Sequence, residues 1–243
     1  PNAHSLNLNR HAEWHIHQSA AQFNICTPFI YRDPRDVYWI RPYIPSDTLY
    51  ELLNTDYHFN IDGLLESAAK KFKLIHNLPT STAWPRIDFQ DRTNHYWKQI
   101  INDGLSTDTN NTLLQLKQTL NQTLETVGYA PRLCHMDANP KNWIIDHNQL
   151  FLIDWEYSAI GNPLWDLAVF CDEFKLDPWQ TEIFLNCYGR INSIQFEMAS
   201  KQMHYLSALW YSVQGMFSSE KLIKELQSIL EFEHTKVQKE LEF

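Results

Sequence analysis

Residues 133–154 carry the side chains of this sequence that are best suited to chemistry. They read L-C-H-M-D-A-N-P-K-N-W-I-I-D-H-N-Q-L-F-L-I-D. The apolar runs W-I-I and L-F-L-I bracket four polar residues, which is typical of a β-hairpin. Asp137 and Asn142 lie in the loop before this hairpin and Asp154 lies at its end, so folding would bring two carboxylates and an amide oxygen together. Because Mg²⁺ prefers such hard oxygen ligands and also binds phosphate oxygens, the segment predicts phosphoryl transfer.

This spacing, together with two later motifs, resembles that of small-molecule kinases. His135, Asp137 and Asn142 fit the kinase loop H-x-D-x-x-x-x-N, and Asp154 stands where kinases carry a later metal-binding aspartate. The chain continues W-E-Y after Asp154 and reads G-N-P-L-W-D-L-A over residues 161–168. Both motifs are similar to those of the aminoglycoside phosphotransferase and choline kinase group. The resemblance runs from about Arg10 to about Ser219.

The resemblance implies a role for each matched residue of the loop. Asp137 would accept or orient the proton of the substrate hydroxyl, and Asn142 and Asp154 would hold Mg²⁺ across the phosphates of ATP. His135 and Asp166 would support the loop without touching the reacting atoms.

Two charged residues near these motifs need separate treatment. Glu13 lies on a predicted helix that, by the resemblance, carries the glutamate that pairs with an ATP-binding lysine in kinases. The first lysine of the chain is Lys70 and its first glycine is Gly63, so the resemblance places that lysine and the phosphate loop upstream of Pro1. The order H-x-E-x-H around Glu13 departs from the zincin motif and argues against a zinc hydrolase. Lys141 is either a solvated lysine or a phosphate contact.

The substrate that the resemblance implies is a small cationic alcohol. Quaternary ammonium groups are attracted to the faces of aromatic rings. Tyr157 and Trp210 lie within matched motifs and are the first candidates for substrate binding, followed by Trp165 and Glu156. The run L-W-Y-S-V-Q over residues 209–214 resembles the late helix of choline and ethanolamine kinases. Choline or ethanolamine is therefore the first prediction for the acceptor.

Several alternatives stay open. The runs I-D-W-E-Y and H-Y-W-K-Q, the second over residues 95–99, are similar to those of bacterial thiamine kinase, so thiamine ranks second. An aminoglycoside is a further alternative acceptor. A kinase-like binding protein without turnover is the non-catalytic alternative, and the oligomeric state is open.

Local patterns predict the elements that must position these residues. Apolar spacing and the absence of internal proline predict helices over residues 9–23, 61–78, 112–127 and beyond Pro163. Turn residues predict hairpins that pair 27–31 with 37–44, around D-P-R-D, and 143–145 with 150–153, around residues 146–149. Ser46 and Asp47 are predicted to cap a short helix, and residues 80–95 to be irregular.

The resemblance assembles these elements into an α+β protein-kinase-like fold. Residues 1–43 would be a partial N-terminal lobe with its upstream strands missing, and residues 44–50 the hinge. Residues 51–243 would form a mainly helical catalytic lobe with the second hairpin embedded in it. Because the hinge backbone of such folds binds adenine, Tyr43 and Ile44 are the predicted nucleotide contacts.

Composition narrows the class of partner. The formal net charge is -9, from 29 acidic and 20 basic residues, and no basic run is present, which argues against nucleic acid. The four cysteines are scattered without a C-x-x-C pair and fit free thiols in a reducing compartment. Because no apolar run is long enough for a membrane span and the first residues do not read as a signal peptide, the prediction is a cytoplasmic protein without a membrane partner.

Overall fold

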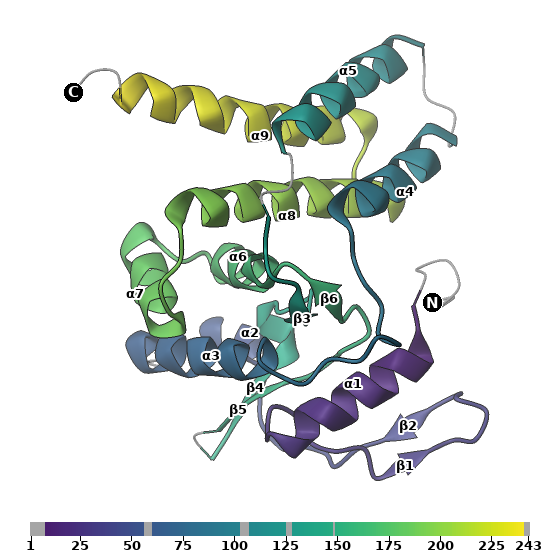
Figure 1. Ribbon diagram of the computed structural model, residues 1–243, viewed down its shortest axis with the longest axis vertical. Helices are drawn as coiled ribbons and strands as arrows, with labels where there is room; N and C mark the ends of the chain where they lie inside the picture. Colours follow the sequence, from purple (N-terminus) through teal and green to yellow (C-terminus); the bar gives the residue numbers. More distant parts are fainter. Residues whose placement is uncertain (1–7, 56–59, 103–106, 125–127, 148, 241–243) are drawn as a thin grey trace. The chain divides into compact units, whose positions relative to one another are not determined.

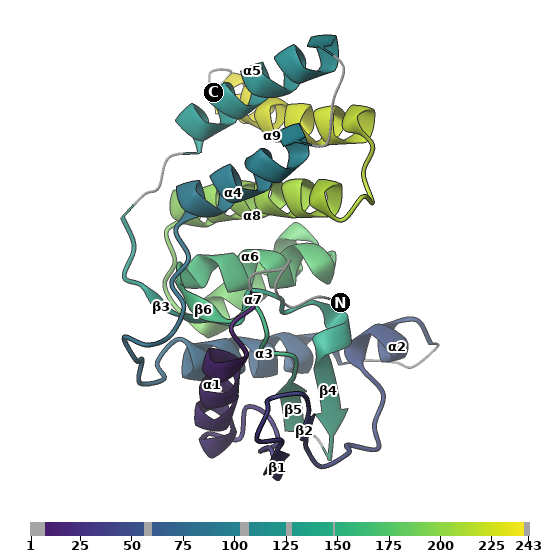
Figure 2. The ribbon, with the colours of Figure 1, turned by 90° about the vertical axis from the view of Figure 1, so that its right-hand side faces the viewer.

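The computed structural model describes residues 8–55, 60–102, 107–124, 128–147 and 149–240. The chain divides into two compact units. The first unit combines residues 1–86 with 129–193, and the second combines residues 87–128 with 194–243. Helices predominate in both units, and the strands are short (Figures 1 and 2).

The first unit holds every strand of the described residues, as three antiparallel pairs: β1–β2, β3–β6 and β4–β5. The strands are β1 (Tyr31–Arg32), β2 (Trp39–Ile40), β3 (Arg132–Cys134), β4 (Trp143–Asp146), β5 (Gln149–Leu152) and β6 (Ala159–Gly161). The helices of this unit are α1 (Arg10–Gln22), α2 (Leu49–Leu53), α3 (Ile61–Ile75), α6 (Pro163–Glu173) and α7 (Pro178–Tyr188), with the 3-10 helix η1 (Pro140–Asn142).

Helix α1 packs on the β1–β2 hairpin, as Figure 1 shows. The helix begins after Asn9, whose side chain accepts a hydrogen bond from the Ala12 amide at 3.0 Å. Trp14 of the helix stacks on Phe29 with ring centroids 5.0 Å apart and meets Trp39 edge-on at 5.6 Å. The predicted helix and hairpin are both confirmed, although the strands of the hairpin are only two residues long.

Helices α3 and α7 lie side by side over the core of the first unit (Figure 1). Phe72 of α3 is fully buried, and its ring contacts those of Trp143, Phe170 and Phe184 at centroid distances of 5.4, 5.7 and 6.1 Å. The edge-to-face geometry of these pairs adds to the free energy gained from burial. The helix predicted from residue 61 is confirmed and ends at Ile75, three residues earlier than expected.

The β4–β5 hairpin is confirmed, with a tighter turn than the sequence predicted. Trp143 pairs with Leu152, and Asp146 pairs with Gln149, so two of the four residues predicted for the turn belong to the strands. The hairpin joins the rest of the unit through two backbone contacts. Thr48 forms a β-bridge with Ile144, and the Leu152 amide donates to the Ile25 carbonyl at 2.9 Å.

Two local predictions are wrong. Helix α2 is capped by Thr48, which forms a reciprocal capping box with Glu51, whereas Ser46 donates its hydroxyl hydrogen to Asp146 at 3.1 Å. Residues 80–95 are not irregular throughout, because α4 (Phe89–Asn102) begins inside them. The side chain of Asp88 accepts a hydrogen bond from the Asp91 amide at 3.0 Å, which starts this helix as a cap would.

The second unit is helical in all its described elements: α4, α5 (Thr107–Thr123), α8 (Ser193–Val213) and α9 (Ser219–Glu240). In Figure 2, α4 lies beside α8 and α5 lies beside α9. The Trp97 indole donates to the Tyr205 hydroxyl at 2.7 Å, and this hydroxyl donates to Asn121 at 3.2 Å, so α4, α5 and α8 share one buried polar chain. The predicted helices are confirmed over the described residues, and the parts of those predictions that fall on residues 125–127 and 241–243 lie outside them. Within the described residues, no helix has the length and apolar character needed to cross a membrane.

Candidate active site

The loop after β3 is held by Asp166 at the start of α6. Its two carboxylate oxygens accept hydrogen bonds from the backbone amides of His135 and Met136, each at 2.7 Å. Met136 has a φ of 69°, in the left-handed region that a side chain disfavours. Because Asp166 is fully buried, its bonds to two successive amides fix this turn and aim the next residue, Asp137.

Asp166 also connects the loop to α3 and α7. His76 lies with its Nε2 3.1 Å from the Asp166 carboxylate and its Nδ1 2.9 Å from the Tyr188 hydroxyl. The ligand atoms of His76, Cys134 and Asp166 all lie within 4.8 Å of one another. Each of the three side chains already has a hydrogen-bond partner. His76 and Asp166 have the partners given above, and the Cys134 thiol donates to the Arg132 carbonyl at 3.5 Å. Burial raises the pKa of the Cys134 thiol, so we assign this cluster to a hydrogen-bond network and not to a metal.

His135 braces the loop from inside. Its Nδ1 accepts a hydrogen bond from the Asp137 amide at 3.3 Å, so its Nε2 carries the hydrogen that is donated to the Ile153 carbonyl at 3.0 Å. Burial lowers the pKa of this fully buried imidazole and favours its neutral form. The ring meets Trp155 edge-on at 4.8 Å. His135 therefore ties the Asp137 loop to the chain just before Asp154.

Both carboxylate oxygens of Asp137 accept hydrogen bonds from side-chain amides. Asn139 donates to Oδ1 at 2.8 Å, and Asn142 donates to Oδ2 at 3.0 Å and to the Asp137 carbonyl at 2.7 Å. Burial raises the pKa of Asp137, while His135 and the two amide hydrogen bonds lower it and the charge of Asp154 raises it. The half-buried carboxylate is thus fixed in orientation and poised to take a proton.

A backbone hydrogen bond just after β5 brings Asp154 near Asn142. The Ile153 amide donates to the Asn142 carbonyl at 2.9 Å, which places Asp154 beside the loop. Asp154 is exposed and has a φ of 67°, so the backbone turns sharply at the residue that leaves the strand. Because the amide nitrogen of Asn142 is bound to Asp137, its amide oxygen is the atom left for a cation. Amide and carboxylate oxygens are ligands that Mg²⁺ accepts.

A second group of charged residues is near enough to Asp154 to feel its charge. Arg10 of α1 contacts Glu13 at 2.6 Å and Glu156 at 3.2 Å. Burial, with smaller contributions from the charges of Glu156 and Asp154, raises the pKa of Glu13 to about 7 against the lowering effect of Arg10. Burial also raises the pKa of Glu156, and Asp154 adds to this shift. Carboxylates that repel one another in this way favour a bound cation.

The residues predicted to bind the nucleotide and the acceptor have fewer contacts with the Asp137 loop. Tyr43 is 87% exposed and Ile44 is half-buried, and among the described residues no hydrogen bond or ion pair joins either to the site. Tyr157 is half-buried and directly follows Glu156. Trp165 is fully buried, with its ring under Gly161. Their roles, and that of the half-buried Trp210 on α8 of the second unit, stay predictions.

Sequence reasoning missed three residues of this site. Arg10, His76 and Asn139 carry no motif of their own, and their contacts to Glu156, Asp166 and Asp137 appear only in the folded chain. An asparagine two residues after Asp137 was the one signal available, because asparagine commonly turns and caps the chain. Lys141, whose role was open, places its ammonium group 5.0 Å from the ring centroid of Tyr50.

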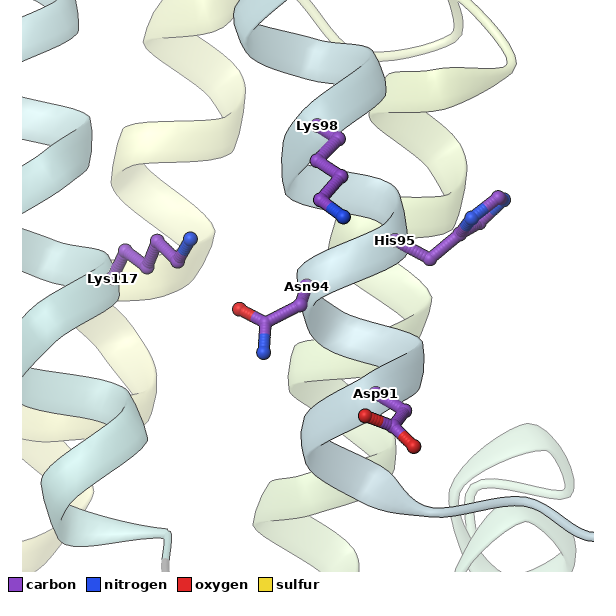
Figure 3. Close-up of a pocket in the computed structure, with 5 residues that line it drawn as sticks. All are labelled: Asp91, Asn94, His95, Lys98 and Lys117. Atoms are coloured by element: carbon purple, nitrogen blue, oxygen red, sulfur yellow. The ribbon is translucent and has the colours of Figure 1, made fainter.

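A separate cavity of about 380 Å³ lies within the second unit, lined by Asp91, Asn94, His95, Lys98 and Lys117. Figure 3 shows Asn94 of α4 and Lys117 of α5 pointing into the space between the two helices, and His95 pointing away from it. His95 and Lys98 belong to the run that resembles thiamine kinase, whereas Trp97 of the same run is fully buried in the core. The cavity contains none of the predicted catalytic or metal-binding residues.

Proteins named LicA or LicA homolog are similar to this chain in sequence. Protein LicA of Haemophilus influenzae is 33% identical over 76 residues, which cover 30% of this chain and 28% of that protein. The LicA homolog of Mycoplasma capricolum is 20% identical over 194 residues, or 79% of this chain and 74% of that protein. The match to the Haemophilus protein therefore spans less than a third of its length.

Solved structures show the fold. A choline/ethanolamine kinase family protein from Mesorhizobium loti superposes with a TM-score of 0.72 at 18% identity, over 92% of this chain and 79% of that one. Choline kinase LicA from Streptococcus pneumoniae gives 0.69 at 19% identity, over 95% and 82%. The GDP complex of aminoglycoside 2'-phosphotransferase-IIIa gives 0.63 at 14%, over 93% and 83%.

The predicted α+β protein-kinase-like fold is thereby confirmed. The family is shown independently by sequence, since residues 3–200 match the model of the phosphotransferase enzyme family, APH. This match covers residues 3–86 and all of residues 129–193 of the first unit, together with residues 87–128, which lie between them in the sequence. The chain belongs to the phosphotransferase enzyme family.

Proposed function

We propose that this protein transfers the γ-phosphoryl group of ATP to the hydroxyl of a small cationic alcohol, with choline or ethanolamine as the first candidates. One observation carries the proposal. Asp137 has both oxygens fixed by asparagine amides, one of them from Asn142, and Asp154 follows Ile153, whose amide is bonded to the Asn142 carbonyl, so that the charge of Asp154 acts on Asp137. A base beside a pair of metal-binding oxygens is the arrangement that phosphoryl transfer to an alcohol requires.

In this reaction the acceptor oxygen forms a bond to the γ-phosphorus as the bond to the ADP oxygen breaks. The hydroxyl proton passes to Asp137, whose raised pKa suits a group that must hold a proton briefly. Burial lowers the pKa of His135 and both of its ring nitrogens are hydrogen-bonded, so we assign it to orienting the loop and not to receiving this proton.

The donor set fits Mg²⁺, which we assign to the oxygens of Asn142 and Asp154. When bound, Mg²⁺ would neutralise charge on the phosphates. The repulsion between Asp154, Asp137 and Glu156 raises the pKa of the latter two, and a cation between them would relieve it. The GDP bound by the aminoglycoside phosphotransferase supports a nucleotide as co-substrate.

We further propose that residues 1–43 belong to the N-terminal lobe, that residues 44–50 form the hinge, and that residues 51–243 form the catalytic lobe. Contacts of Ser46 and Thr48 with β4 support a connecting role for 44–50. The backbone of Tyr43 and Ile44 would bind adenine, and Glu13 would order the N-terminal side of the site.

For the acceptor, we propose Glu156, Tyr157, Trp165 and Trp210. Glu156 lies beside Asp154 and supplies negative charge for a cationic group, and aromatic rings add about 0.5–2 kcal/mol each through cation–π attraction. The choline kinase named LicA among the similar structures supports choline as the acceptor.

The test is ATP consumption by the purified protein with choline, ethanolamine, thiamine and an aminoglycoside, each with Mg²⁺. We expect turnover with choline or ethanolamine, and a loss of at least about 100-fold in Asp137→Asn with its thermal stability kept. Turnover confined to thiamine or the aminoglycoside would overturn the acceptor assignment. Binding of an acceptor without any turnover would establish the non-catalytic alternative.

A further inference from the structure

We propose that Asn139 is a positioning residue that fixes the rotation of the Asp137 carboxylate. The inference rests on the proposed function only in taking Asp137 as the group that receives the hydroxyl proton. Neither the kinase loop motif nor the sequence pattern assigns a role to the residue two positions after this aspartate.

The orientation of the Asn139 amide is determined by the backbone. Asn139 is the N-cap of η1, and its Oδ1 accepts a hydrogen bond from the Lys141 amide at 2.9 Å. A backbone N–H can only donate, so the atom facing Lys141 is the oxygen. The amide nitrogen therefore faces Asp137, and it donates to Oδ1 at 2.8 Å.

Asn142 completes the arrangement from the other side. Its Nδ2 lies 2.7 Å from the Asp137 carbonyl, an acceptor, and 3.0 Å from Oδ2. With one amide on each oxygen, the carboxylate cannot rotate without breaking a hydrogen bond. Each oxygen keeps a second lone pair, and these lone pairs have fixed directions.

Fixed direction matters because proton transfer depends on the alignment of donor and acceptor. A displacement of about 1 Å in a catalytic group reduces the rate by about 100-fold. Without Asn139, Oδ1 would lose its partner and the carboxylate could turn about Asn142. The acceptor hydroxyl would then meet the base less often in a productive geometry, with its binding unchanged.

Two functions of Asn139 can be separated by substitution. Serine is a good N-cap and keeps an oxygen for the Lys141 amide, but it is too short to replace the donor to Asp137. Aspartate also keeps the cap oxygen and places an acceptor where the donor was. Alanine removes both interactions. Asn77→Ser, at an exposed asparagine of the same unit, is the matched control.

We expect Asn139→Ser and Asn139→Asp to lower kcat by about 10- to 100-fold, with the KM values for ATP and acceptor within about twofold of the wild type. Asn139→Ser should keep its Tm, whereas Asn139→Ala should lose about 2–4 °C in addition to activity. Asn139→Gln, whose longer amide can still donate, should recover part of kcat. Wild-type kcat in both Asn139→Ser and Asn139→Asp would overturn the inference, as would a change confined to KM.

A measurement that needs no turnover distinguishes this inference from the proposed function. In the ¹⁵N-labelled protein, the side-chain amide hydrogens of Asn139 should exchange slowly with solvent, and Asp137→Ala should make them exchange fast. If no acceptor is phosphorylated but this dependence holds, the proposed function fails and the positioning of Asp137 by Asn139 stands. Exchange that is unchanged by Asp137→Ala overturns the positioning itself.

Discussion

Three carboxylates, Asp137, Asp154 and Glu156, come close enough at the candidate site for the charge of one to raise the pKa of another. A positive charge bound beside these carboxylates would relieve their repulsion. Arg10 supplies one positive charge, to Glu156 and Glu13, and it does not contact Asp154 through any ion pair of the described residues. Asp154 is therefore the carboxylate best placed for a metal ion.

Asp154→Ala should raise the Mg²⁺ concentration for half-maximal activity by at least about tenfold, because it removes a charged oxygen ligand. The measurement is the rate of ATP consumption against Mg²⁺ concentration, with ATP held saturating. Asp62→Ala, at an exposed aspartate of α3, should titrate like the wild type. A wild-type titration curve for Asp154→Ala would refute the metal assignment.

His17 on α1 makes folding stability dependent on pH. Burial lowers the pKa of His17 to about 4, below its ordinary value near 6.5, while the ring lies 2.7 Å from the Thr27 carbonyl and stacks on Phe29. The unfolded chain therefore binds this proton first as the pH falls. The contribution of His17 is fully present above pH 6.5 and is lost as the pH falls toward 4.

We expect the free energy of unfolding of the wild type to fall between pH 6.5 and 4 by up to about 3 kcal/mol more than that of His17→Phe. Urea denaturation at several pH values measures this difference. His15→Gln, at an exposed position of the same helix, should follow the wild type. Parallel pH profiles for His17→Phe and the wild type would show that His17 is not buried in its neutral form.

At the scale of elements, the sequence predicts what is local. The β4–β5 hairpin follows from two apolar runs around polar residues, and the start of α3 follows from its apolar spacing. The β3–β6 pair is invisible in the sequence, because each strand has three residues and no turn signal joins Cys134 to Ala159 across the intervening chain.

The same distinction holds for the candidate site. The proximity of Asp137, Asn142 and Asp154 is expected because the hairpin between them is local. The distant contacts around the site are a different matter: His76 reaches Asp166 across 90 residues of sequence, and Arg10 reaches Glu156 from the first helix. Such contacts depend on tertiary packing, which short-range patterns do not encode.

Substitution of Phe72 tests how these elements pack together. Its ring joins α3 to β4, α6 and α7 through aromatic contacts. Phe72→Ala should reduce the free energy of unfolding by about 3–5 kcal/mol through lost burial and the cavity left behind. Urea denaturation followed by tryptophan fluorescence measures it, since Trp143 reports on this region. Leu74→Ala, 44% exposed on the same helix, should cost far less, and equal losses would contradict this core.

At the scale of the whole molecule, net charge acts on the substrate before any contact forms. A formal charge of -9 attracts a cation from solution, and added salt screens this attraction. The four acidic residues on or beside the candidate site, Glu13, Asp137, Asp154 and Glu156, strengthen the attraction there.

The KM for choline should therefore rise several-fold as the salt concentration increases from about 10 mM to about 300 mM, where the Debye length falls from about 30 Å to below 10 Å. The neutral isostere 3,3-dimethylbutan-1-ol should show no such rise, because it carries no charge to attract. Steady-state kinetics at fixed Mg²⁺ and ATP provide both values. Equal salt dependence for the two alcohols would exclude electrostatic attraction of the acceptor.

The bonds from Asp166 to the amides of His135 and Met136 set an order for assembly during translation. When the ribosome has released Asp137, Asn142 and Asp154, every proposed catalytic and metal-binding group has been synthesised. The left-handed turn at Met136 still lacks the carboxylate that holds it, because Asp166 follows 30 residues later. A nascent chain thus passes through a stage with a complete set of reactive side chains and no organised site, and the beginning of α6 ends that stage.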